Sequence, residues 1–157
     1  MPTQWLPVVV GGVIAGALDI SYACLFWALK ADVGPQRIFQ SVASGLLGRS
    51  SFTGGAATAV LGLALHFLIA ISMSVVYYLV ARRWELLWKR PLLAGALYGL
   101  LLYAIMNYVV LPLSQAAPAS KDRLWVVLSI VVHMILIGIP IALAARAARG
   151  TLGVAAR

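Results

Sequence analysis

Four long apolar stretches, separated by shorter polar segments, dominate the pattern of hydrophobic and polar positions along this chain. They cover residues 7–29, 56–80, 91–111 and 124–145. At a rise of about 1.5 Å per residue, helices of this length cross the roughly 30 Å hydrocarbon core of a bilayer. The pattern predicts an all-α integral membrane protein with four transmembrane helices, in which residues 1–157 form a single transmembrane domain.

A weaker helical pattern lies between the first two spans, over residues 36–48. Ile38, Val42 and Leu46 recur at helical spacing on one face, and Pro35 suits the start of a helix. An apolar face on such a short helix favours a position in the membrane interface. We therefore expect a short interfacial helix between spans 1 and 2, followed by a glycine- and serine-rich loop up to residue 55.

The composition agrees with a membrane protein and argues against a nucleic-acid partner. Hydrophobic residues make up 63% of the chain and the mean hydropathy is +0.99, whereas soluble domains are about 45–50% apolar. The net charge of +8 is spread over loops and ends and forms no basic face. The single cysteine, Cys24, lies inside the first span, so no intramolecular disulfide can form.

Basic and aromatic residues predict the orientation. The turn at 82–90 concentrates Arg82, Arg83, Lys89 and Arg90 beside two spans, and short basic loops face the cytoplasm. Four spans then place both termini on that side. The first span starts without a basic residue, so we interpret it as an uncleaved helix. Two interfacial aromatic belts are expected, with Trp5, Trp84 and Trp88 in one and Trp27, Tyr108 and Trp125 in the other.

Polar residues inside the spans fall at one depth. By helical rise, Asp19 lies about 16 Å, His66 about 15 Å and His133 about 14 Å from the start of its span, while Asn107 lies about 24 Å along the third. A mid-membrane carboxylate costs at least ~2.5–3.5 kcal/mol, so Asp19 should face protein or water and have a partner. Tyr22 lies on the same helical face as Asp19.

An Asp with two His residues allows several kinds of chemistry. Asp19, His66 and His133 could exchange protons or bind an ion, hold zinc or a similar divalent metal, or provide two axial histidines for a b-type haem. Alternatively, each His forms a hydrogen bond between helices. The chain contains no HExxH, CxxCH or GxSxG motif, so an enzyme is disfavoured and no cofactor is assigned.

Small residues on two spans indicate close helix packing. Gly12 and Gly16 share one face of the first span, and Gly95 and Gly99 share one face of the third. These faces could pack within the chain, in a homo-oligomer or against a partner in a membrane complex. A structural or assembly subunit is therefore the alternative to a transport-type or proton-responsive protein, which we favour, and a haem protein comes third.

A weak internal repeat suggests that two helical hairpins are related. The sequence AGAL at residues 15–18 recurs at residues 94–97, and LHFLI at 65–69 resembles VHMIL at 132–136. A tandem duplication would produce this pattern. In that alignment Tyr98 takes the place of Asp19, and His66 corresponds to His133.

Four segments carry a resemblance to a known family. These are GGVIAGALDISYA at 11–23, SVASGLLGRSSFTGG at 41–55, LGLALHFLIA at 61–70 and YAIMNYVVLPLS at 103–114. They resemble the YagU-like group of small four-span bacterial inner-membrane proteins, which has been linked to acid resistance. The resemblance implies a bacterial inner membrane and proton-linked physiology, and it carries no functional residue over to this chain.

Overall fold

The computed structural model describes residues 4–155 of the chain, and those residues form helices and connecting segments without a strand. The first two spans are single helices, α1 (Trp5–Ala31) and α3 (Gly55–Ala81). The third consists of α5 (Pro91–Ile105), η2 (Met106–Val110) and α6 (Leu111–Leu113), and the fourth of α7 (Arg123–Val132), η3 (His133–Gly138) and α8 (Ile139–Ala155). The prediction of four helices long and apolar enough to cross a membrane is confirmed.

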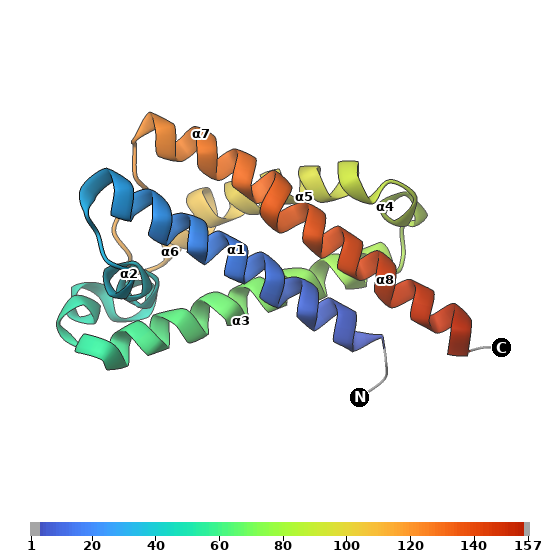
Figure 1. The fold of residues 1–157 in the computed structure, drawn as a ribbon, viewed down its shortest axis with the longest axis horizontal. Coiled ribbons are helices and arrows are strands. Elements are labelled where there is room, and N and C mark those ends of the chain that lie inside the picture. Colours follow the sequence, from blue (N-terminus) through green and yellow to red (C-terminus); the bar gives the residue numbers. More distant parts are fainter. Residues whose placement is uncertain (1–3, 156–157) are drawn as a thin grey trace.

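The spans run alternately up and down along one bundle (Figure 1). The start of α1, the short helix α4 (Glu85–Lys89) and the end of α8 lie at one end. The helix α2 (Pro35–Leu47), the 3-10 helix η1 (Gly48–Thr53) and the connection before α7 lie at the other. We call these the terminal end and the α2 end.

The segment between the first two spans is more ordered than its sequence predicts. The helix expected at 36–48 is present as α2, but the loop expected after it is largely the 3-10 helix η1. Hydroxyl groups explain this, because Ser50 donates to the carbonyl of Leu47 at 2.7 Å and Thr53 to that of Ser50 at 2.9 Å. Each bond joins residues three apart, the spacing of a 3-10 turn.

The helix α2 packs tightly against α3. A Cβ atom built on Gly62 of α3 would lie 1.8 Å from the carbonyl oxygen of Phe39, so only glycine allows this approach. Gln40, a polar residue off the apolar face, is 3% exposed and donates to the carbonyl of Gly55 at 3.0 Å. A hydrogen-bonded buried amide holds α2 on the protein, which the interfacial pattern alone did not indicate.

The glycines singled out in the sequence all lie at contacts within the bundle. A Cβ on Gly12 would lie 2.6 Å from Cα of Ile71 in α3, and one on Gly16 would lie 3.0 Å from Cβ of Ala70. On the other side of the bundle, Gly95 and Gly99 face the fourth span: a Cβ on Gly95 would lie 2.7 Å from the carbonyl oxygen of Gly138, and one on Gly99 would lie 1.9 Å from that of His133. These contacts join α1 to α3 and α5 to η3.

The third and fourth spans each contain a π-helical segment shortly before a proline. The segment η2 ends two residues before Pro112, and η3 ends two residues before Pro140. Proline has no N–H and its ring clashes with the carbonyl four residues earlier, so a wider turn just before it relieves the conflict. The irregular turn before Pro140 is a π-helix, in which His133 is the first residue.

A buried core closes the bundle toward the terminal end. It includes Tyr77 and Tyr78 of α3, Trp88 of α4, and the small or branched residues Ile141, Ala142, Ala145 and Ala148 of α8. The hydroxyl of Tyr98 donates to the carbonyl of Met73 at 2.8 Å. The outer surface is apolar as well, with Leu29, Val60 and Leu113 between 67% and 83% exposed. Such a surface suits contact with lipid.

The contact of Gly99 with the fourth span gives a test of the packing. Gly99→Ala should destabilise the folded protein by about 1–3 kcal/mol, because the added methyl group meets the carbonyl of His133, which is backbone and cannot rotate away. Gly45→Ala is the control: it lies inside α2 with its nearest neighbour, Cβ of Ser114, at 3.8 Å, and should be neutral or about 0.5–1 kcal/mol stabilising. Unfolding in mixed detergent micelles measures both. Equal stability of the two variants would contradict the packing.

Candidate functional site

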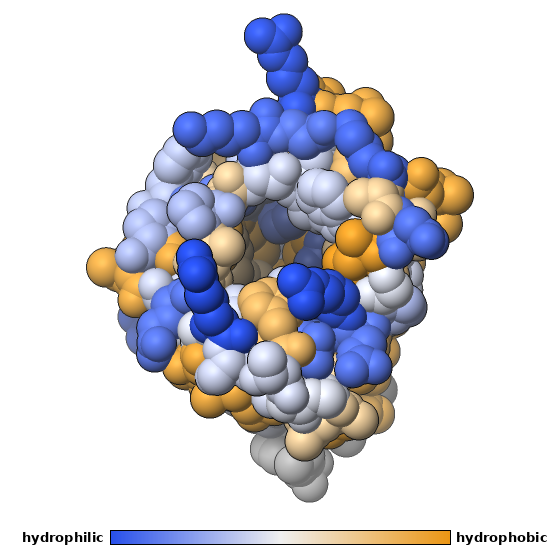
Figure 2. Space-filling view, turned by 90° about the vertical axis from the view of Figure 1, so that its left-hand side faces the viewer, coloured by the Kyte–Doolittle hydropathy of each residue, from blue (hydrophilic) through white to orange (hydrophobic). Residues whose placement is uncertain are grey.

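A cavity of about 720 Å³ lies inside the bundle on the α2 side of the buried core. All four spans and α2 contribute to its lining. Figure 2 looks onto the α2 end and shows a hollow at its centre, with hydrophilic residues around much of the rim. The cavity is thus open at the α2 end, and the core with its tyrosines lies at the terminal end.

The mouth is built from α2 and the connection between α6 and α7. Gln115 of that connection donates its backbone N–H to the carbonyl of Gly45 at 3.0 Å and its side-chain amide to that of Leu46 at 2.7 Å. These bonds satisfy carbonyls that the last turn of a helix leaves without partners. Arg37 also lines the mouth, with its guanidinium 4.4 Å from the ring centre of Phe52.

An aromatic cluster fills the space between α1 and α7. Trp125 of α7 stacks on Tyr22 of α1, with ring centres 5.3 Å apart and planes at 9°. Phe26 and Trp27 contact the same indole, at 5.0 and 5.3 Å. Trp27 and Trp125 line the cavity. Their rings thus form a wall of the cavity, and the interfacial belt expected for both residues stays a prediction.

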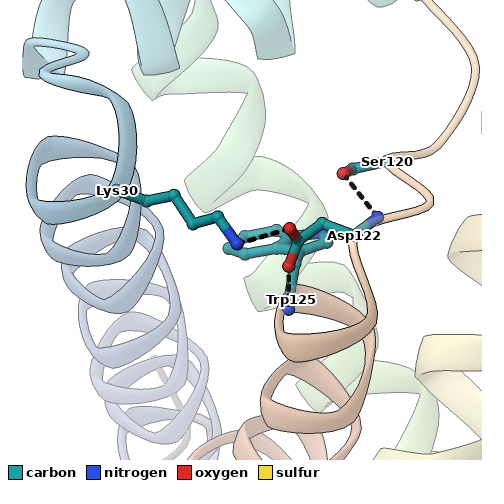
Figure 3. A network of polar contacts seen from close by, with 4 residues as sticks. All are labelled: Lys30, Ser120, Asp122 and Trp125. Carbon is teal, nitrogen blue, oxygen red and sulfur yellow. Dashed lines mark hydrogen bonds and ion pairs between the residues drawn. The ribbon is translucent and has the colours of Figure 1, made fainter.

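An ion pair joins α1 to α7 just beyond this cluster. Lys30, near the end of α1, pairs with Asp122 at the start of α7 (Figure 3). The other carboxylate oxygen of Asp122 accepts the backbone N–H of Trp125 at 2.9 Å, which caps α7. The hydrogen bond from Lys30, with that from the Trp125 backbone, lowers the pKa of Asp122 below its ordinary value.

Asp19 lines the cavity from α1. Its carboxylate makes no hydrogen bond or ion pair with any residue that the structure describes. The protein partner expected for this mid-span carboxylate is therefore not found. The side chain borders the open space of the cavity instead. Water in the cavity would solvate the carboxylate in place of a protein partner.

The two histidines line the same cavity and are oriented by backbone carbonyls. Nε2 of His66 lies 2.9 Å from the carbonyl oxygen of Gly16, and Nδ1 of His133 lies 2.9 Å from that of Ser129. A carbonyl can only accept, so each of these nitrogens carries the proton. The opposite nitrogens, Nδ1 of His66 and Nε2 of His133, are left to accept a hydrogen bond or a proton.

Two further predicted residues contribute differently. Asn107 of η2 lines the cavity and donates its amide to the carbonyl of Tyr103 at 2.9 Å, which leaves its side-chain oxygen available. Tyr22 does not line the cavity; its hydroxyl lies 3.3 Å from Oγ of Ser129, which does. The structure thus brings Asp19, His66, His133 and Asn107 to one cavity and places Tyr22 behind its aromatic wall.

The cavity residues do not form a metal centre. Within the described part of the chain, no three His, Cys, Asp or Glu side chains gather closely enough to hold a metal ion. Asp19, His66 and His133 share a cavity without converging on one point, so a shared first shell is not formed. A b-type haem held by Nε2 of both histidines would require His66 to give up its bond to Gly16.

Several cavity residues were not singled out in the sequence. Ser129 is one, and Ser41, Ser44 and Ser114 near the mouth are others. Serines occur throughout this chain and donate to carbonyls of their own helix, as Ser44 does to Ser41 at 2.6 Å. The position of a serine in the sequence therefore does not indicate whether it lines a cavity. Trp27 and Trp125 were singled out as members of one aromatic belt, but the sequence did not predict that they line a cavity.

No family model, curated protein or solved structure matches this chain. The resemblance to YagU-like proteins therefore stays an expectation. What the structure itself defines is a helical bundle with four helices suited to cross a membrane and a polar cavity that opens at one end.

Neighbouring residues on the third span test whether water reaches the cavity. In a Cys24→Ala background, Met106→Cys should react with a small charged thiol reagent, because Met106 lines the cavity. Ile105→Cys should not react in lipid, because Ile105 lies outside the lining and is 37% exposed on an apolar surface. The labelled fraction is read by mass spectrometry. Protection of Met106→Cys would show that the cavity is closed to water.

The ion pair at the α2 end predicts an acid-dependent stability. Because the pKa of Asp122 is lowered in the folded state, its contribution is fully present above the ordinary Asp value and is lost as pH falls through the lowered value. Asp122→Asn should lower the melting temperature near pH 7 and show a smaller further decrease in acid than the wild type. Asp32→Asn, at the exposed end of α1, should retain the wild-type acid profile. An unchanged acid profile in Asp122→Asn would contradict this role.

Proposed function

We propose that this protein is a small transport-type membrane protein that responds to protons through Asp19, with His66 and His133 as proton-exchanging partners in one cavity. The observation that supports this most directly is the cavity itself. It brings three titratable side chains from three different spans to one space that opens at one end and is bordered by a packed core at the other. A cavity of this kind is typical of ligand sites between the helices of a bundle.

The histidine geometry supports proton exchange. Each ring already donates one N–H to a backbone carbonyl, which fixes its orientation, while its second nitrogen is available to take a proton. Imidazole is the side chain that changes charge nearest to neutral pH. A nearby carboxylate can share such protons, and groups that interact in this way titrate as a unit.

The two glycine faces that suggested an assembly subunit are buried within the bundle. Gly12 and Gly16 pack against α3, and Gly95 and Gly99 pack against the fourth span, so neither face is left open for a partner. A role in assembly would need another surface of the bundle.

We further propose that the protein resides in a bacterial inner membrane with both termini in the cytoplasm, so that the cavity opens to the periplasm. The basic turn that contains α4 supports this orientation. In a Cys24→Ala background, a cysteine at Glu85 should be labelled only from the cytoplasmic side and one at Ser50 only from outside. The reverse result would turn the cavity toward the cytoplasm.

Proteoliposomes provide the test of proton linkage. An imposed pH step should acidify vesicles that contain wild-type protein faster than empty ones, as reported by a trapped pH dye. Asp19→Asn should abolish this difference while circular dichroism shows a folded protein, because Asn has similar size and cannot titrate. His66→Gln and His133→Gln should each reduce the rate, and either change should add little to Asp19→Asn, as expected for groups that act as a unit. Asp32→Asn is the matched control and should behave as the wild type.

A wild-type rate in Asp19→Asn, or no acidification by the wild-type protein, would overturn the proposal and favour the assembly subunit.

A further inference from the structure

The charge of the cavity points to the class of molecule that it binds, an inference that rests on the function proposed above. The titratable or charged side chains that line it are Asp19, Arg37, His66, Tyr103 and His133. Arg37 lies at the mouth against Phe52, and each histidine in its neutral form donates one N–H to the backbone. Asp19 is therefore the one acidic side chain of the inner cavity, and its carboxylate is the group there that can carry a negative charge.

The carboxylate of Asp19 has no partner among the described residues, so its charge is available to a ligand. An inorganic cation such as Mg²⁺ or Ca²⁺ needs six or more oxygen ligands, mostly carboxylates and carbonyls. Here the lining has a single carboxylate, and no three His, Cys, Asp or Glu side chains gather to hold a metal ion in the described part of the chain. The donor set suits a cation that needs one counter-charge and little coordination.

The walls suit the apolar part of such a cation. Trp27, Trp125, Tyr103 and Phe52 present aromatic rings from four elements, and Met73 and Met106 add polarisable thioethers. Aromatic faces attract cations whose charge is spread over alkyl or aryl groups, with quaternary ammonium as the usual example. A volume of about 720 Å³ is enough for a drug-sized molecule.

We propose that the cavity binds an amphipathic organic cation, such as a quaternary ammonium or phosphonium compound, with its charge at Asp19 and its apolar groups against the aromatic wall. An organic anion of the same shape is rejected by Asp19. The selectivity for charge comes from one carboxylate, and the tolerance for shape comes from the apolar lining.

Two probes of nearly identical shape and opposite charge test this. Tetraphenylphosphonium should bind purified wild-type protein in uncharged detergent micelles, measured by isothermal titration calorimetry against protein-free micelles, and tetraphenylborate should not. Asp19→Asn should weaken phosphonium binding by about tenfold or more, which corresponds to about 1.4 kcal/mol. Asp32→Asn removes an equal charge from the exposed end of α1 and should bind as the wild type. Equal binding in Asp19→Asn and wild type, or binding of the borate by the wild type, would overturn the proposal.

The aromatic wall is tested separately. Trp27→Leu should weaken phosphonium binding several-fold, whereas Trp84→Leu, which removes a 64% exposed indole outside the cavity, should not. Trp27→Phe keeps an aromatic face and should retain most of the affinity, which separates loss of the ring from a folding defect. Wild-type affinity in Trp27→Leu would contradict the role of this wall.

The phosphonium titration and the proteoliposome assay test the two proposals independently. Phosphonium binding that depends on Asp19, together with no acidification of proteoliposomes, would retain the ligand class and overturn the transport proposal. Acidification that depends on Asp19, together with no phosphonium binding, would retain the proton role and overturn the ligand class.

Discussion

The close approach of helix backbones at glycine is the constraint on which the rest of this structure depends. Gly99 lies so near the fourth span that a methyl group would meet the carbonyl of His133, and Gly12 lies similarly close to Ile71 of α3. Helices that lie in a bilayer gain little from burying more apolar surface, so close contact between small residues is what holds such helices together. These contacts fix the helix pairs, and the buried core at the terminal end forms around them.

The cavity lies where the helices are not packed tightly. Toward the α2 end, α1 meets α7 through the large rings of Tyr22, Phe26, Trp27 and Trp125, with the pair of Lys30 and Asp122 beyond them. Rings of this size hold backbones apart where glycine would let them touch. The bundle is therefore closed at one end and hollow at the other, and the polar residues of its middle depth border the hollow.

The conflict between proline and helical hydrogen bonding shapes the same region. The π-helical segments that precede Pro112 and Pro140 contain Asn107 and His133, and both side chains line the cavity. A π-helical turn adds a residue to the ring of each hydrogen bond and rotates the side chains that follow. Asn107 and His133 thus lie on backbone whose geometry is set by a proline a few residues later.

Local composition was enough to predict the four long helices and α2, because length, apolar content and helical rise are properties of each segment alone. The sequence could not decide which faces meet. These spans are apolar on nearly every side, so their periodicity does not separate a lipid-facing side from a protein-facing one. Tertiary packing turned Trp27 and Trp125 toward the cavity and left Asp19 without a protein partner. It also set the two hairpins in different registers: Gly12 lies against Ile71, whereas Gly138, which corresponds to Ile71 in the internal repeat, lies against Gly95, one helical turn beyond the residue that corresponds to Gly12.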